Sequence, residues 1–400
     1  MITRYYNGVL FRRTPISCVA AAFFLAVIAP AANAAVTFPV EAKWSATLPA
    51  PPEFAPAFDA NRIYVALKTK QLVALLIKDG TTSWSVECPI SAPPAAGAGL
   101  VYIGSEDAIE ARSESDGSVQ WRRPVKGRIL SLHWDAGWLF AQTEPGPLLA
   151  LRAADGEILW QKDFRSPLSA LPAASADRLY LALMDGRIMA LTLQAGDEVW
   201  TETLAEPAAG ILPVGDRVYI GARDKYFRSL SADDGDEDWR YPTGADILGV
   251  PVLDSRRVYF IALDNVLRGH NRNNGSMDWK RVLPVRPFTG PLLSGSTLIV
   301  SGVAAQLHAY SSLDGKPAGN HEVKGAENEE MLLAAPPHLS AQDSLILVTK
   351  GGYVRALGSP PPAAPEAAPS TAPASPAETP PTPAPDPEAA GAAGGASPTP

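Results

Sequence analysis

Short runs of apolar, β-branched and aromatic residues recur along most of the chain, and each run is followed by a turn signal. Examples are residues 62–65, 178–181, 217–220 and 257–260, which read Arg-Ile-Tyr-Val, Arg-Leu-Tyr-Leu, Arg-Val-Tyr-Ile and Arg-Val-Tyr-Phe. Side chains of this kind favour pleated strands, and the Asp-Gly and Asn-Gly pairs between runs supply the positive φ angles of tight hairpins. The pattern predicts an all-β protein.

A tryptophan follows the glycine of these turns by four residues in six successive segments. The spacing from one tryptophan to the next is 37 to 40 residues, the length of one four-stranded propeller blade. A seventh turn, Asp314-Gly315, has Gly319 at the tryptophan position. The repeated tryptophans, together with an N-terminal one in the same register, are Trp44, Trp84, Trp121, Trp160, Trp200, Trp239 and Trp279.

A small residue stands five positions before each turn, and again near the C-terminus. These residues are Ala74, Ala111, Ala150, Ala190, Ser229, Gly269, Ala309 and Ala356. Because propeller blades pack face to face, a small residue on one blade can leave room for a large side chain of its neighbour. We therefore expect the repeated tryptophans to be structural and to fill these places.

The two ends of the repeat array are incomplete in complementary ways. Residues 345–348 and 353–357 give two strands of a last copy, but the chain then continues into Gly358-Ser359-Pro360 without a fourth strand. Residues 41–48 resemble that missing strand, and Trp44 precedes Trp84 by 40 positions. The register predicts an eight-bladed β-propeller of four-stranded antiparallel blades, closed by the N-terminal strand in the last blade.

The segments outside the repeats have a different composition. Residues 1–34 combine three arginines and no acid with an apolar run and an Ala-Asn-Ala site, which predicts a signal peptide and export to the periplasm or beyond. The apolar run is too short for a membrane span, and both the general and the twin-arginine export routes stay open. Residues 35–358 form the predicted propeller, and residues 359–400 form a predicted disordered tail rich in Pro and Ala.

Charge and cysteine content exclude several classes of function. Removal of the signal leaves 31 basic against 42 acidic residues, an unfavourable balance for binding nucleic acid. Cys88 is then the single cysteine, so neither an internal disulfide nor a cysteine-rich metal site is expected. We expect a monomer that is stabilised by packing and is not an integral membrane protein.

Two features are candidates for partner binding. The residue before the small position is Arg228, Arg268, His308 and Arg355 in four consecutive repeats, which predicts a basic arc for an anionic partner. The alternative is a variable position whose arginines extend to solvent. Trp134 lies outside the repeat register and is either an exposed binding residue or partly buried under a loop.

No catalytic or metal-binding constellation stands out. The acidic run 233–238 coincides with a repeat turn, and its glycine is out of place for a calcium loop, so a solvated hairpin is expected. The five histidines have no paired spacing for zinc, and no nucleophile elbow, P-loop or dinucleotide motif occurs. We expect no catalytic, cofactor-binding or metal-binding residues.

The unit Pro147-Leu148-Leu149-Ala150-Leu151, followed by Asp155-Gly156 and Trp160, resembles the pyrroloquinoline quinone (PQQ) propeller repeat, over about residues 41–357. In size and simplicity the chain is similar to the outer-membrane assembly lipoproteins of the BamB type. That resemblance implies a non-enzymatic, cofactor-free periplasmic scaffold that contacts envelope proteins through loops on one face.

The chain departs from the patterns of these relatives at two places. Ala35, rather than a lipobox cysteine, follows the predicted cleavage site, so a lipid anchor is not expected. Quinoprotein dehydrogenases resemble the repeat too, but they use a vicinal cysteine pair, which a chain with Cys88 alone lacks. A small quinoprotein-type or sugar-binding propeller, with PQQ or sugar in the central funnel, remains the alternative.

Overall fold

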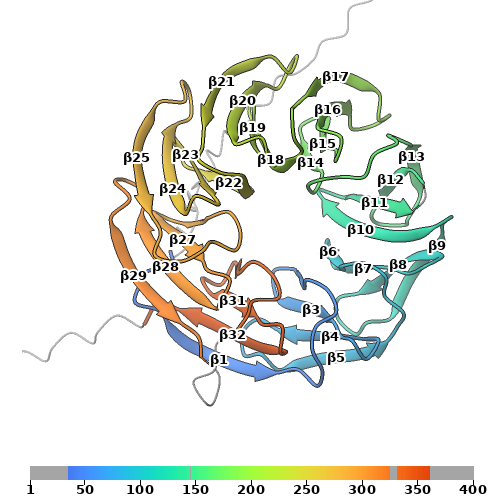
Figure 1. Cartoon of the computed structure of the whole chain (residues 1–400). Coiled ribbons are helices and arrows are strands. Elements are labelled where there is room, and N and C mark those ends of the chain that lie inside the picture. The colour runs from blue at the N-terminus through green and yellow to red at the C-terminus, as the bar shows by residue number, and fades with distance from the viewer. Residues whose placement is uncertain (1–34, 145, 325–330, 361–400) are drawn as a thin grey trace, which may run out of the picture. The chain divides into compact units, whose positions relative to one another are not determined.

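The computed structural model describes residues 35–144, 146–324 and 331–360, and these residues form β-strands and loops. Eight four-stranded sheets surround a central axis, as Figure 1 shows. The predicted eight-bladed all-β propeller is confirmed. In this part of the chain no helix is long and apolar enough to cross a membrane. The predicted signal peptide and all but the first two residues of the predicted tail lie outside the described residues.

We number the blades along the chain and name the strands of each blade from the ring centre outward. Blade 1 contains β2 (Ala57–Phe58), β3 (Arg62–Ala66), β4 (Gln71–Leu76) and β5 (Thr82–Glu87). Blade 2 contains β6 (Ala95–Gly97), β7 (Leu100–Gly104), β8 (Ala108–Ser113) and β9 (Val119–Pro124). Blade 3 contains β10 (Arg128–Asp135), β11 (Trp138–Glu144), β12 (Leu148–Arg152) and β13 (Ile158–Lys162). Blade 4 contains β14 (Ala173–Ser175), β15 (Arg178–Ala182), β16 (Arg187–Thr192) and β17 (Glu198–Thr203).

The second half of the ring repeats this order. Blade 5 contains β18 (Ala208–Val214), β19 (Arg217–Ala222), β20 (Tyr226–Ser231) and β21 (Glu237–Pro242). Blade 6 contains β22 (Ile247–Leu253), β23 (Arg257–Ala262), β24 (Val266–Asn271) and β25 (Met277–Val282). Blade 7 contains β26 (Leu292–Ser294), β27 (Thr297–Ser301), β28 (Gln306–Ser311) and β29 (Pro317–Glu322). Blade 8 contains β30 (His338–Leu339), β31 (Leu345–Val348), β32 (Tyr353–Gly358) and, as its outer strand, β1 (Glu41–Thr47).

The N-terminal strand closes the ring as predicted. β1 pairs antiparallel with β32, and Trp44 lies opposite Ala356. Beyond the strand, the backbone N–H of Thr37 donates a hydrogen bond of 2.8 Å to Ser359 Oγ. The first and last described segments therefore lie side by side in blade 8, which leaves no blade incomplete.

Each repeated tryptophan joins its own blade to the next one. Trp160 is 8% exposed, and its indole N–H donates to the carbonyl oxygen of Leu193 in blade 4 at 2.9 Å. Its ring covers Gly196, which has a φ of 67° and whose missing Cβ would lie 2.9 Å from the ring. A side chain on that glycine would be strained and would collide with the tryptophan. The Asp-Gly turn is thus also the seat of the neighbouring blade's tryptophan.

The small residue has a different role from the one that the repeat suggested. Ala150 lies directly opposite Trp160 on the adjacent strand of the same blade, and Ala190 lies opposite Trp200 in the same way. In blade 6 the Cβ absent from Gly269 would lie 2.6 Å from the ring of Trp279. The small residue therefore makes room for the tryptophan of its own blade, and the expectation of a partner on the neighbouring blade is wrong. Opposite residues on paired strands share one face of the sheet, which explains the pairing.

The blade without a repeated tryptophan is filled from the N-terminus. Phe38 packs over Gly319, where a Cβ would lie 2.7 Å from the Cβ of Phe38. Val36, two residues earlier, anchors this segment. Its side chain is fully buried, and its N–H donates a hydrogen bond to Ser294 Oγ. An aromatic ring from outside the repeat therefore occupies the space that a tryptophan fills in the other blades.

A buried histidine in blade 6 makes the stability of the ring dependent on pH. His270 is fully buried and lies edge to face against Tyr241 and tilted against Phe260, and its Nδ1 lies 2.9 Å from the carbonyl oxygen of Gly275. Burial lowers the pKa of His270 to about 4, below the usual value near 6.5. Between these values the unfolded chain takes up a proton that the native state excludes.

The free energy of unfolding should therefore fall as the pH is lowered from 6.5 towards 4. By linkage, His270 should lower the free energy of unfolding at pH 5 by an amount on the order of 1–2 kcal/mol relative to pH 7. Leucine occupies the equivalent position in blades 3, 4 and 5, as Leu151, Leu191 and Leu230. Urea unfolding at pH 7 and pH 5 checks this, and His270→Leu should show the smaller acid loss. Equal losses in both proteins would contradict the assignment.

Candidate interaction face

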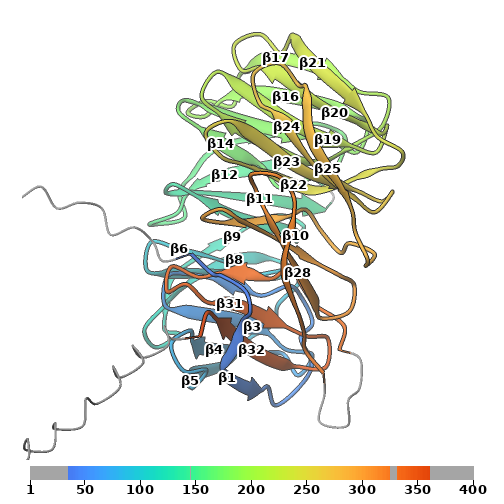
Figure 2. The same ribbon diagram turned by 90° about the vertical axis from the view of Figure 1, so that its left-hand side faces the viewer.

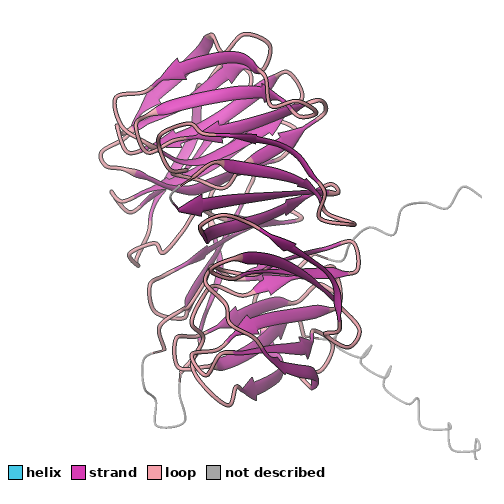
Figure 3. Ribbon diagram, turned by 90° about the vertical axis from the view of Figure 1, so that its right-hand side faces the viewer, coloured by secondary structure: helices cyan, strands magenta, loops and turns pink. Residues whose placement is uncertain are grey.

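The antiparallel blades divide the ring into two faces of different construction. Turns after the first and third strands of a blade lie on one face, which we call the turn face. Turns after the second strand and the connections between blades lie on the other, which we call the loop face. Figures 2 and 3 show the ring edge-on, with loops at both ends of the strands. A partner that binds through long connections would therefore meet the loop face.

The turn face carries many carboxylates, and the turns themselves account for them. Asp116 accepts the N–H of Ser118 at 3.0 Å, and this bond lowers the pKa of the carboxyl group. Hydrogen bonds from Lys316 likewise lower the pKa of Asp314 to about 2. In the acidic run 233–238, Asp234 accepts from the N–H of Asp236, and Asp238 lies 3.2 Å from Arg217. Among the described residues no group of three His, Cys, Asp or Glu side chains is placed to hold a metal ion.

The predicted basic arc occupies equivalent positions but is largely buried. Arg228 and Arg268 are 7% and 6% exposed, and each makes two hydrogen bonds to the aspartate four residues earlier. These aspartates, Asp224 and Asp264, stand in the turns before the strands that carry the arginines. Two of the four cations are thus neutralised inside their own blades and stabilise loop-face turns.

The other two members of the arc are more accessible. His308 is half-buried, and Arg355 is half-buried with its guanidinium 5.0 Å from the ring centre of Tyr353. Both lie on the third strand of their blade, opposite Val300 and Leu347 respectively. A role of these positions in partner binding stays a prediction.

Trp134 is partly buried and belongs to the contact between blades 2 and 3. Its ring covers Gly97 in β6, where a Cβ would lie 2.1 Å from the indole. It packs against the buried cluster that contains Ile129 and Leu132. The structure therefore gives Trp134 a packing role, and contact with a partner stays a prediction.

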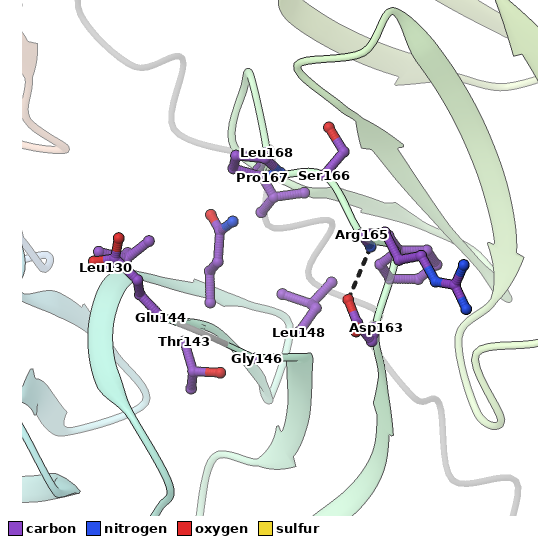
Figure 4. A pocket seen from close by; sticks show the side chains of 12 residues that line it. Leu130, Thr143, Glu144, Gly146, Leu148, Asp163, Arg165, Ser166, Pro167 and Leu168 are labelled. Carbon is purple, nitrogen blue, oxygen red and sulfur yellow. Dashed lines mark hydrogen bonds between the residues drawn. The ribbon is translucent and has the colours of Figure 1, made fainter.

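A cavity opens on the loop face between blades 3 and 4. It has a volume of about 310 Å³, and Leu130, Leu148, Pro167 and Leu168 form its apolar part, as Figure 4 shows. Residues 163–168, the first part of the connection from β13 to β14, form one wall of this cavity. Within the connection, Arg165 has a φ of 59°, and its N–H donates to Asp163 Oδ1 at 2.8 Å.

Exposed apolar side chains stand beside this cavity. Leu171, at the end of the connection, is 56% exposed, and Met184, in the turn between β15 and β16, is 43% exposed. The N–H of Met184 donates to the carbonyl oxygen of Pro167 at 2.8 Å, so the turn and the connection are held together. Leu168 also forms a β-bridge with Leu183. We call the apolar residues of these two segments the 3–4 site: Phe164, Pro167, Leu168, Leu171 and Met184.

The repeat analysis missed the 3–4 site because it compared strands and turns and left out the connections between blades. One signal was available in the sequence. Phe164, Leu168 and Leu171 stand with two prolines, Pro167 and Pro172, in the segment that separates two strands. The connections before blades 1 and 7 are built in the same way, because Pro52 and Pro287 form the β-bridges that correspond to the bridge of Leu168. Apolar residues in a long loop, where burial is not assured, indicate a contact surface.

Comparison with known proteins gives the family. A family model described as "Outer membrane protein assembly factor BamB" matches residues 40–127, 105–214 and 184–359, which cover most of the chain. The BamB protein of Nitrosomonas eutropha is 28% identical over 162 residues, 38% of this chain and 40% of that protein. The BamB protein of Yersinia pestis is 23% identical over 274 residues, 64% of this chain and 68% of that protein.

A solved structure agrees with these matches at the level of the fold. The crystal structure of BamB from Moraxella catarrhalis superposes with a TM-score of 0.65 at 17% identity, and it covers 80% of this chain and 98% of that one. Such identity shows the propeller architecture alone. The family model, which matches from the closing strand to the last blade, shows the membership. This chain belongs to the family of the outer membrane protein assembly factor BamB.

Proposed function

We propose that this chain is a non-enzymatic scaffold of the cell envelope that takes part in outer-membrane protein assembly. It would act in the periplasm, without a cofactor, by holding a protein partner on its loop face. The observation that carries this proposal is the 3–4 site, where Leu171 and Met184 are exposed on two segments that are bonded to each other, one of which lines a cavity. Family membership supports the role in assembly.

The exposed apolar side chains of the 3–4 site favour binding of a partner. Two exposed apolar side chains beside a cavity gain free energy when a partner covers them. The surrounding segments are held by backbone hydrogen bonds, from Met184 to Pro167 and from Ser169 to Ala182, so little order has to be created on binding. Aromatic and large apolar anchors in such places carry most of the binding energy of an interface.

The leading test removes the apolar surface. The double variant Leu171→Ser and Met184→Ser should weaken binding of the assembly partner about tenfold, since truncated anchors commonly cost more than 1 kcal/mol. The measurement is recovery of an identified envelope partner on the immobilised protein, followed by titration with that partner.

The matched control is Leu313→Ser, because Leu313 is 67% exposed but lies in a turn on the turn face. It should leave partner binding unchanged. Unaltered binding by the double variant, or an equal loss in the control, would rule out the 3–4 site as the docking surface. The alternative of a quinone- or sugar-binding propeller has no specific support from the described residues.

A further inference from the structure

Three arginines occupy equivalent positions in blades 5, 6 and 8, and two of them have a carboxylate partner in their own blade. The carboxylate of Asp224 accepts hydrogen bonds from both terminal nitrogens of Arg228, at 2.9 and 2.6 Å. Asp264 binds both terminal nitrogens of Arg268 in the same way. In these two blades the turn between the second and third strands therefore places one carboxylate against the arginine.

Blade 8 keeps the arginine but lacks the carboxylate. Arg355 has Gly351 four residues earlier, in the turn between β31 and β32. A Cβ on Gly351 would meet no atom within 4 Å, so the place that Asp224 fills in blade 5 is open here. The guanidinium of Arg355 donates to the hydroxyl oxygen of Tyr353, and no carboxylate of the described residues forms an ion pair with it. A half-buried cation without a counter-charge favours binding of an anion.

A histidine of blade 7 faces Arg355 across the seam between the two blades. His321 lies opposite Leu307 on the adjacent strand, and opposite residues share one face of a sheet. Arg355 lies opposite Leu347 in the same way, and both leucines belong to one buried cluster. The Nε2 atom of His321 has no hydrogen-bond partner among the described residues. Burial lowers the pKa of His321, and the guanidinium of Arg355 lowers it further.

The seam reaches the surface and carries an excess of positive charge. Ser45 lies opposite Arg355 on β1 and is exposed, and Gly351 is exposed on the loop face. The carboxylate next in sequence to His321, that of Glu322, lies on the opposite face of β29, where Gln306 donates to it at 3.3 Å. The described part of this seam therefore holds a cation and a histidine without an acidic partner.

We infer that the seam between blades 7 and 8 binds a carboxylate of a partner protein, held by Arg355 in the place that an aspartate of the same chain fills in blades 5 and 6. We call this the 7–8 site: Ser45, His321, Gly351 and Arg355. An aspartate or glutamate side chain is the ligand that fits, because a guanidinium binds both oxygens of a carboxylate and the repeat already uses this pair. The site lies on the other side of the ring from the 3–4 site and does not depend on it (Figure 1).

A small carboxylate probe tests this inference without an envelope partner. The probe is N-acetyl-aspartate N-methylamide, titrated into the full chain with its histidines labelled with carbon-13, and the imidazole signals are followed by NMR over a pH series. The probe should raise the pKa of His321, because a carboxylate beside an imidazole favours the charged ring. The asparagine analogue of the probe should have no effect. His308, on the opposite face of blade 7, is the internal reference and should not respond.

Two substitutions at the site should change this response in different ways. Arg355→Met should weaken binding of the probe about tenfold, as expected for loss of a charge-assisted pair, and should raise the pKa of His321 in the absence of the probe. Gly351→Asp should also raise the pKa of His321 without the probe, and it should abolish the response because the chain then supplies the carboxylate. Gly351→Asn is the matched control, since it adds a side chain of the same size without charge and should keep the response.

Several results would overturn the inference. One is a wild-type protein whose His321 does not respond to the probe, and another is a response that persists in Gly351→Asp. A response to inorganic phosphate but not to the probe would assign the site to phosphate groups. Glu327, Glu329 and Glu330 lie outside the described residues. A response that appears only when all three are replaced by glutamine would mean that the chain fills the site with its own carboxylates.

Discussion

Deletion of residues 35–50 should make the protein aggregate or pair edge to edge. The deletion removes β1 and leaves the backbone groups of β32 unpaired along an open strand. It also removes Trp44 from its seat on Gly80 and Phe38 from its place over Gly319. Both defects expose apolar surface, so we expect most of the protein to form dimers or larger aggregates. Size-exclusion chromatography with light scattering measures it directly.

A point variant separates the two defects. Trp44→Ala keeps the closing strand but empties the contact with blade 1, including the hydrogen bond of 2.7 Å from the indole N–H to the carbonyl oxygen of Ile77. It should lower thermal stability while the protein stays in the oligomeric state of the wild type. If the deletion variant were as soluble and as stable as the wild type, closure by β1 would be unimportant for the ring.

Truncation of a central tryptophan should be nearly as damaging. Trp160→Ala or Trp200→Ala should lower the free energy of unfolding by about 3–5 kcal/mol, the usual cost of removing a large buried aromatic side chain. Trp200, 6% exposed, covers Gly235 and donates to the carbonyl oxygen of Ala232 at 3.0 Å. The loss therefore includes a hydrogen bond and the contact between two blades.

Urea unfolding followed by circular dichroism gives the required comparison. The control is Gln161→Ala, because Gln161 is exposed on the same strand as Trp160 and should change stability by less than about 0.5 kcal/mol. A tryptophan variant that unfolds at the wild-type denaturant concentration would show that the rings are not needed for docking between blades.

The architecture of the ring could be predicted because each sequence repeat carries the residues that form one blade. Turn glycines, the following tryptophans and the small residues are set by contacts that recur in every blade, so one register predicts all of them. The same register placed Trp44 in the last blade, and the structure pairs it with Ala356. The partner of each small residue was predicted wrongly, because spacing along a chain does not tell which of two packed sheets a side chain meets.

The candidate sites were much less predictable, because they depend on contacts that a comparison of single repeat positions does not include. Burial of Arg228 and Arg268 depends on the aspartates of the preceding turns, a pairing that the comparison of single positions did not include. The 3–4 site arises from a loop conformation, which tertiary contacts determine. Phe38 in blade 7 belongs to no repeat, so nothing in the pattern assigned it to the empty position.

The pairing of β1 with β32 also sets an order on folding. The two strands are separated by more than 300 residues, so β1, which is synthesised before the other described strands, is the last to find its partner. Closing so long a loop costs little extra entropy, because that cost grows only with the logarithm of loop length, but such distant pairing is slow. Until blade 8 is complete, Trp44 and its strand stay open to mispairing with other chains. Newly synthesised molecules should therefore be prone to association mainly through residues 41–47.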